Sequence, residues 1–348
     1  MLFKDYEIIQ TGGKFVSGIN KTGTVYGGQG STLYKTDDFL TTDWEQVHDF
    51  AADIRQVREM PDGSLVVALR DGTMWTSNEA QDSWSQATFE DGSTPFEMIS
   101  PGGHVQYGFG LDWWGDILVA GEYGSGTNKV YLSGDKGSTW KQIFTNPDPT
   151  PGHIHDVAFD PYEGIVWVCA GDGGRQNRIF FSHNYGYTWQ QIPVDYNFRA
   201  TMIIPLPDCV LFGSDDTRGM YIARYDRHKG GTSGQVVKPE VAWSCARQWH
   251  GGTPWMTHAA ITHDADNPVA YFGFLQGGGN IYAPSIIWKT EGGKKFTPVW
   301  IEPRLPKHDN AVHVGILGTY GPDENNVLVA RLVSLYGGED EQLLKIQL

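Results

Sequence analysis

The sequence has few cysteines, few basic residues and no long apolar run, and each shortage excludes a class of protein. Its three cysteines, Cys169, Cys209 and Cys245, are odd in number and lack metal-site spacing, so neither a disulfide framework nor a zinc site is indicated. Cys169 and Cys209 lie in apolar, strand-like runs, and we expect both to be thiols of the core. No segment is apolar for long enough to cross a bilayer, so we expect no membrane partner.

Basic residues are outnumbered by acidic ones. The 26 Lys and Arg face 41 Asp and Glu, which gives a formal net charge of -15. A phosphate backbone needs a basic footprint, so we expect no nucleic-acid partner. Residues 1–7 lack a basic start followed by an apolar stretch, and no secretory signal is therefore expected. We expect a cytoplasmic protein or a component of a phage virion.

Glycine and aromatic residues are abundant: the chain has 44 Gly, 13 Trp, 16 Tyr and 16 Phe, and only 19% of it is charged. This profile is typical of many short strands that are joined by tight turns, with aromatic rings packed between sheets. All-β repeat folds often use a length of 348 residues as one unit.

One short motif recurs along the chain. Ser133–Trp140 reads Ser-Gly-Asp-Lys-Gly-Ser-Thr-Trp, and Ser182–Trp189 reads Ser-His-Asn-Tyr-Gly-Tyr-Thr-Trp. Looser copies begin at Thr36, Ser77 and Thr290. Such a segment suits a tight turn between antiparallel strands: Asp or Asn accepts backbone N–H bonds, Gly adopts a positive φ, and the aromatic ring packs below.

These copies resemble the Asp-box, or bacterial neuraminidase repeat, of sialidases and related β-propellers. Two of them match the pattern S-x-D-x-G-x-T-W well, with Asn184 in the place of Asp in the second. The resemblance implies a sialidase-like propeller, with these boxes in the turns between third and fourth strands. In that family the active site lies on the opposite face, where the links between blades and the loops after second strands meet.

The spacing of the copies gives the number of blades. They begin about 50 residues apart, except for one double-length gap before Thr290, and this period matches a four-stranded antiparallel blade. In the fourth unit we expect strands at residues 155–159, 165–170, 178–182 and 189–192. The last unit lacks one strand, and Tyr6–Gln10 is left over at the other end of the chain. We therefore predict a single all-β domain over residues 1–348, a seven-bladed β-propeller that the N-terminal strand closes.

Cationic and phenolic residues stand where the first, innermost strand of several blades should begin. These residues are Arg55, Tyr107, His155, Arg199, His258 and His313. We interpret them as a ring at equivalent positions around one central funnel, because like charges gathered there would need an anionic ligand or carboxylates.

Other polar residues are expected at the same end of the ring. The ends of second strands add Arg70, Glu122, Asp172, Asp215 and Arg331. The long irregular stretch after Tyr225 adds Trp249, His250 and Trp255. Flat aromatic rings beside hydrogen-bonding groups suit a pyranose, so we predict that these residues bind substrate.

The family resemblance suggests a sialidase, but no Arg-Ile-Pro signature is present. A funnel lined by His, Tyr and Arg is more similar to propeller-type polysaccharide lyases, which cleave uronate-containing glycans by β-elimination. In that hypothesis Arg199 neutralises the carboxylate, alone or together with Arg55 or Arg331. His155 accepts the C5 proton, and Tyr107 protonates the leaving oxygen. His258 and His313 bind substrate or exchange roles with them.

Three alternatives stay open. A glycoside hydrolase would use a pair of carboxylates drawn from Glu122, Asp172 and Asp215. No cofactor is required for either reaction, although the central histidines would allow a divalent metal. A non-catalytic propeller that binds a glycan or a protein, or that builds a virion, is the third.

Overall fold

The structure of the chain is a computed structural model. It describes residues 6–11, 14–20, 22–37, 43–90, 92, 111–122, 129–147, 154–171, 177–192, 194, 198–214, 221–227, 240–244, 254–256, 259–262, 266–276, 286–301, 314–334 and 342–348. In these residues the chain forms 31 strands and no helix, which confirms the all-β prediction.

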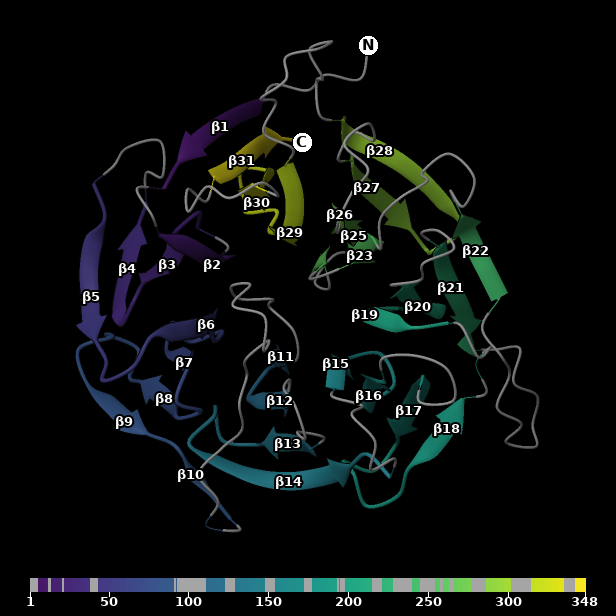
Figure 1. The fold of residues 1–348 in the computed structure, drawn as a ribbon, viewed down its shortest axis with the longest axis horizontal. Coiled ribbons are helices and arrows are strands. Elements are labelled where there is room, and N and C mark those ends of the chain that lie inside the picture. The colour runs from purple at the N-terminus through teal and green to yellow at the C-terminus, as the bar shows by residue number, and fades with distance from the viewer. Residues whose placement is uncertain are drawn as a thin grey trace.

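The strands form a ring of seven blades around a central axis (Figure 1). Blade one contains β2 (Phe15–Ile19), β3 (Val25–Gln29), β4 (Thr32–Thr36) and β5 (Glu45–Asp49). Blade two contains β6 (Ile54–Glu59), β7 (Leu65–Leu69), β8 (Met74–Ser77) and β9 (Trp84–Gln86). Blade three contains β10 (Thr88–Phe89), β11 (Leu111–Trp114), β12 (Ile117–Gly121), β13 (Lys129–Ser133) and β14 (Thr139–Thr145). Blades four and five contain β15 (Ile154–Asp160), β16 (Ile165–Ala170), β17 (Arg178–Ser182), β18 (Gln190–Ile192); and β19 (Ala200–Leu206), β20 (Cys209–Ser214), β21 (Tyr221–Asp226), β22 (Glu240–Ser244). Blade six contains β23 (Pro254–Met256), β24 (Ala260–Ile261), β25 (Val269–Phe272), β26 (Phe274–Gln276), β27 (Ile286–Glu291) and β28 (Lys295–Ile301). Blade seven contains β29 (Val314–Tyr320), β30 (Val327–Ser334), β31 (Gln342–Gln347) and β1 (Tyr6–Gln10).

Two blades depart from the expected four antiparallel strands. In blade three the link from blade two adds β10, which pairs parallel to β14. In blade six the pair β23–β26 forms a two-stranded sheet of its own beside the sheet of β24, β25, β27 and β28. The other blades have the four strands that the repeat spacing predicts, and in blade four the bounds agree within one residue.

The N-terminal strand closes the ring, as predicted. β1 pairs antiparallel with β31 from Tyr6 opposite Ile346 to Gln10 opposite Gln342. The ring of Tyr6 also packs edge-on against Trp300 of blade six, with centroids 6.1 Å apart. The last blade is thus built from both ends of the chain.

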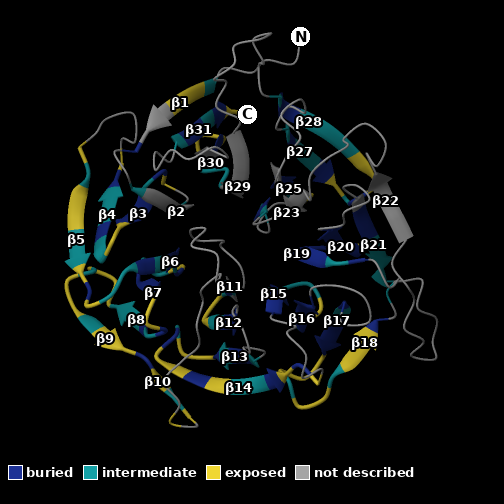
Figure 2. Ribbon diagram, in the orientation of Figure 1, coloured by how far each residue is buried: buried dark blue, intermediate teal, exposed yellow. Residues whose placement is uncertain are grey.

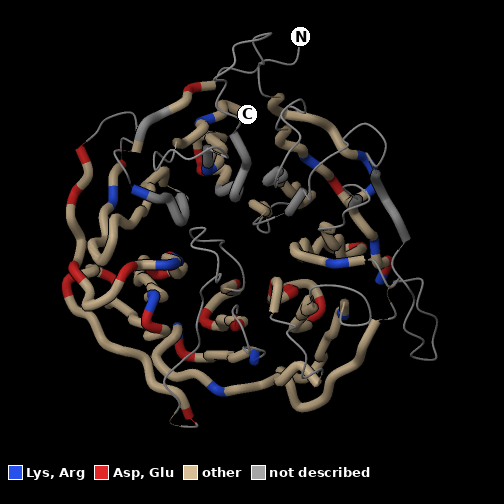
Figure 3. Tube along the Cα trace, viewed as in Figure 1, with Lys and Arg blue, Asp and Glu red and all other residues tan. Residues whose placement is uncertain are grey.

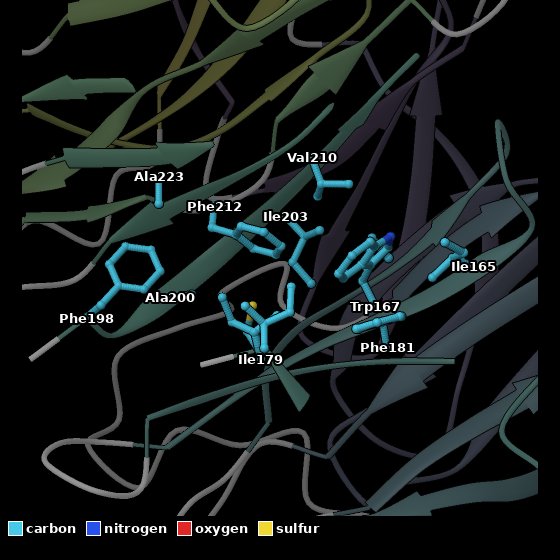
Figure 4. Packing of buried hydrophobic residues seen from close by; sticks show 13 residues of the cluster. Ile165, Trp167, Ile179, Phe181, Phe198, Ala200, Ile203, Val210, Phe212 and Ala223 are labelled. Atoms are coloured by element: carbon cyan, nitrogen blue, oxygen red, sulfur yellow. The ribbon is translucent and has the colours of Figure 1, made fainter. Parts of the chain in front are cut away.

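The core lies between neighbouring blades, because each inner strand has a blade on both of its faces. Two of the second strands are apolar throughout: β7 and β16 are buried along their whole length (Figure 2). Between blades four and five, Trp167 packs against Phe181 and Phe212 (Figure 4). Cys169 and Cys209 are buried free thiols, which confirms their expected place in the core.

The recurring motif forms the expected turn between third and fourth strands. In blade three the Asp135 carboxylate accepts the Thr139 N–H at 2.8 Å, and Ser133 Oγ accepts the Gly137 N–H at 2.9 Å. Trp140 Nε1 donates to the Gly137 carbonyl at 2.8 Å.

The copy in blade four repeats this pattern. Asn184 accepts the Thr188 N–H at 2.9 Å, Ser182 accepts the Gly186 N–H at 2.8 Å, and Trp189 donates to the Gly186 carbonyl at 3.1 Å. Gly137 and Gly186 have φ values of +84° and +90°, which explains the choice of glycine.

Polar side chains also join adjacent blades. The Asp156 carboxylate of β15 accepts the Ile203 N–H of β19 at 2.7 Å. Asp160, at the end of β15, pairs with Arg227 after β21 at 2.5 Å, and both side chains are almost fully buried. Blades are thus fixed to one another by directional bonds as well as by apolar packing.

Candidate functional site

The candidate site lies at the end of the ring where the first strands begin. In an antiparallel blade this end also holds the ends of the second strands, and it is opposite the turns between third and fourth strands. The strands nearest the axis are β2, β6, β11, β15, β19, β23 and β29 (Figure 1). Residues near their starts are therefore the nearest to a shared axial site.

Five of these inner strands carry a β-bulge, at the second residue in β6, β15 and β19 and at the central residue in β2 and β29. The bulged residues are Ser17, Arg55, His155, Thr201 and Leu317. A bulge bends its strand and re-aims a side chain, and bulges are frequent next to binding sites. Arg55 and His155 therefore occupy equivalent positions, as the ring hypothesis requires.

The same register changes the place of one member of the predicted ring, Arg199. Arg199 precedes β19, and Thr201 is the residue that matches His155. Because alternate residues of a strand point to opposite faces, an error of register changes which side chains share a surface. Arg199 itself is half-buried.

His155 joins the inner strands of blades four and five. The residue is 3% exposed, and Nδ1 lies 3.0 Å from the carbonyl oxygen of Ala200. A carbonyl only accepts, so Nδ1 carries the proton, and in the neutral ring Nε2 is the nitrogen without one. The bond fixes both the tautomer and the orientation of the imidazole.

Arg55 lies next to a second arginine. Burial lowers the pKa of its guanidinium, the charge of Arg70 lowers it further, and Asp53 opposes the shift. Arg70 and Asp53 form an ion pair, with Nη1 and Oδ2 3.5 Å apart. The Nε of Arg55 is buried without a hydrogen-bond partner in the described residues. Figure 3 shows basic positions on β6, among the inner strands.

Two other predicted site residues are built into the blades. Glu122 is 6% exposed, and its two carboxylate oxygens accept from the Lys129 N–H at 3.0 Å and the Tyr131 hydroxyl at 3.3 Å. Arg331 was expected at a strand end, but β30 continues to Ser334 and the arginine is 3% exposed. Both residues hold polar positions inside the ring rather than on its open surface.

For the remaining residues, the predicted role in the site stays a prediction. Those that lie outside the described residues are Tyr107, Asp172, Asp215, Trp249, His250, His258 and His313. Trp255 lies in β23, where its backbone pairs with Leu275. In the described part of the chain no three His, Cys, Asp or Glu side chains are close enough to hold a metal ion. Because His258 and His313 lie outside those residues, the divalent metal at the central histidines stays a prediction.

Sequence reasoning missed two arrangements. The first is the grouping of Arg70 and Asp53 around Arg55, for which the sequence showed only that an arginine follows the second strand of blade two. The second is a polar network between blades one and two, in which Glu59 accepts from Asn20 at 3.2 Å and Tyr26 accepts from Gln81 at 2.9 Å. No sequence pattern marks either, because their members meet only across strands.

Comparison with known proteins establishes the fold. No protein-family model matches the chain, and no curated protein sequence does. Among solved structures, U3-55K is similar with a TM-score of 0.64 and 10% identity, over 99% of this chain and 98% of that one. YCF48 from Cyanidioschyzon merolae is similar with a TM-score of 0.58 and 13% identity, over 98% of both chains.

A third similar structure is a catalytically inactive variant of virginiamycin B lyase from Staphylococcus aureus with quinupristin. Its TM-score is 0.59 at 8% identity, over 98% of this chain and all of that one. At such identities the likeness shows a β-propeller and nothing about the reaction. In the described residues there is also no helix long and apolar enough to span a membrane.

Proposed function

We propose that this propeller binds an acidic polysaccharide at the end of the axis where the first strands begin, and cleaves it by β-elimination. The observation that supports this proposal best is the bond from His155 Nδ1 to the Ala200 carbonyl. A general base needs a fixed orientation, which this bond provides, and in the neutral ring the same bond leaves Nε2 as the nitrogen that can accept a proton. The position of His155 on an inner-strand bulge agrees with such a role.

The reaction assigns one step to each group. An arginine neutralises the uronate carboxylate, which makes the C5 proton acidic. His155 Nε2 accepts that proton, the C5 electron pair forms the C4–C5 double bond, and the C4–O bond breaks. Tyr107 gives its proton to the leaving oxygen, and His258 and His313 assist in binding. The proton and electron balance is complete without an oxidant or a reductant.

The two well-formed turns support a sialidase-like, Asp-box type of propeller. In both, one Ser and one Asp or Asn side chain accept the N–H groups of the same two positions. This likeness concerns the architecture. Its bearing on the ligand is indirect: the sialidases, which such turns resemble, act on carbohydrates.

A non-catalytic glycan-binding propeller is the second candidate. It is favoured by the burial of His155, Glu122 and Arg331, because a group that reacts with a polymer must reach it. The hydrolase is less well supported, since both oxygens of Glu122 already accept hydrogen bonds within blade three.

Incubation with uronate polysaccharides separates these functions. A lyase forms an unsaturated uronate that absorbs in the ultraviolet, a hydrolase releases reducing ends without that absorbance, and a binder gives neither. For the lyase we expect His155→Ala to lower kcat/KM about 10²- to 10⁴-fold, the usual contribution of a general base, with affinity little changed. The exposed His183, in a turn at the opposite end, is the control, and His183→Ala should act like wild type.

The melting temperature of each variant shows whether the fold survives. Undiminished elimination by a folded His155→Ala protein would remove His155 as the base. Glycan binding without any product would leave the binding propeller as the function.

A further inference from the structure

Arg55 lies at a β-bulge, which interrupts the regular alternation of side chains along the strand. It is the extra residue of the bulge between Ile54 and Gln56 in β6. The backbone around it is firmly held, because the Ile54 N–H donates to the Gly30 carbonyl at 2.8 Å. The position is therefore fixed by blade one as well as by blade two.

Arg70 approaches from the end of the neighbouring strand. It directly follows β7, and its N–H donates to the Asp53 carbonyl at 2.7 Å. Its guanidinium pairs with the Asp53 carboxylate at 3.5 Å, and both side chains are about half exposed, at 56% and 48%. The start of the first strand and the end of the second strand thus bring two arginines to the same end of the ring.

The charges of this group do not balance. Two guanidinium groups face one carboxylate, and that carboxylate is engaged by Arg70. Arg55 is half-buried, and its Nε is buried without a hydrogen-bond partner in the described residues, which is an unfavourable state for a permanent cation. Natural proteins retain such a group where a ligand supplies the missing charge.

We propose that Arg55 and Arg70 form an anion-binding subsite that recognises the carboxylate of a uronate in the bound polysaccharide. This inference rests on the proposed function, and it moves recognition of the acidic group from Arg199 in blade five to blade two. Guanidinium groups suit this task, because their planar donors match a carboxylate or a sulfate ester. The two anions share the same chemistry, and the test below separates them.

The test is calorimetric titration at low salt with oligogalacturonate, with its neutral methyl ester and with dextran sulfate. We expect wild type to bind oligogalacturonate and not the ester. Arg55→Gln and Arg70→Gln should each weaken binding at least tenfold and reduce its salt dependence. Arg55→Lys should lose less affinity than Arg55→Gln, since lysine keeps the positive charge but not the planar pair of donors. Lys294→Gln removes an exposed charge from a turn at the opposite end and should bind like wild type.

The outcomes distinguish this subsite from the proposed function. Full binding of oligogalacturonate by both glutamine variants would overturn the subsite and leave the function intact. Binding of dextran sulfate alone, weakened by the variants, would keep the subsite and replace uronate by a sulfated glycan.

A stability measurement decides the matter if wild type binds none of these polymers. A cation that waits for a ligand destabilises the empty protein, so Arg55→Gln should then unfold at a higher urea concentration than wild type. A lower unfolding midpoint for Arg55→Gln would assign Arg55 to the framework and overturn the subsite.

Discussion

Glu59 shows how a single side chain links the fold to pH. It ends β6 and accepts from Asn20 of blade one, while its Oε2 is buried without a partner in the described residues. Burial raises the pKa of this carboxyl to about 7, against the bonds from Asn20 and Tyr26 and the charge of Lys35, which lower it. The protonated form is thus the one that the folded state favours.

The pH dependence of stability follows from this shift. Because the folded pKa lies above the unfolded one, the stabilising contribution is complete below about pH 4.5 and is lost as the pH rises through about 7. We expect Glu59→Gln to raise the free energy of unfolding at pH 8 by about 1 kcal/mol, a figure reduced for solvent screening, and to change little at pH 4.

Urea unfolding at several pH values measures this effect. Glu45→Gln removes an exposed carboxylate of blade one and is the control. An equal effect of Glu59→Gln at pH 4 and pH 8 would show that its ionisation is not coupled to folding.

At the scale of the element, the turn of blade four depends on packing against blade three. A Cβ on Gly186 would lie 2.5 Å from Ile143 Cβ and 2.9 Å from the Ile143 carbonyl oxygen. Trp189 Nε1 donates to that same carbonyl at 2.9 Å. The turn therefore acts as a clamp between two blades as well as a link between two strands.

Alanine at this position should loosen the clamp. Gly186→Ala combines a φ of +90° with backbone overlap, and we expect it to lower the free energy of unfolding by about 2–4 kcal/mol. Gly134→Ala, in the matching turn of blade three, meets nothing within 4 Å and should change it by about 0.5 kcal/mol or less. Denaturant unfolding compares the two, and equal stabilities would refute the clamp.

At the scale of the whole molecule, stability depends on closure of the ring. β1 supplies the outer strand of blade seven, and Tyr6 also contacts Trp300 of blade six. Deletion of residues 1–10 should lower the unfolding midpoint and expose the edge of β31 to pairing with other chains. Deletion of residues 1–5, which precede β1, should have little effect.

Denaturant unfolding and light scattering measure both consequences of the deletion. A protein without residues 1–10 that keeps the wild-type midpoint and size would show that the ring does not depend on this strand.

The sequence by itself determined the architecture. The turn motif, its spacing near 50 residues and the spare strand Tyr6–Gln10 were enough to predict seven blades and their closure, because each is a local pattern that the chain repeats. The extra strand β10 and the division of blade six were not predictable, since pairing between links depends on where the blades come to rest.

Only the tertiary structure decided which polar residues share a position. The sequence placed Arg55, His155 and Arg199 alike at strand starts. The bulges show that Arg55 and His155 are equivalent, and that the equivalent residue of blade five is Thr201 and not Arg199. A bulge is a property of two paired strands and leaves no signal in either one. For the same reason the burial of His155 and the approach of Arg70 to Arg55 became visible only once neighbouring strands were in contact.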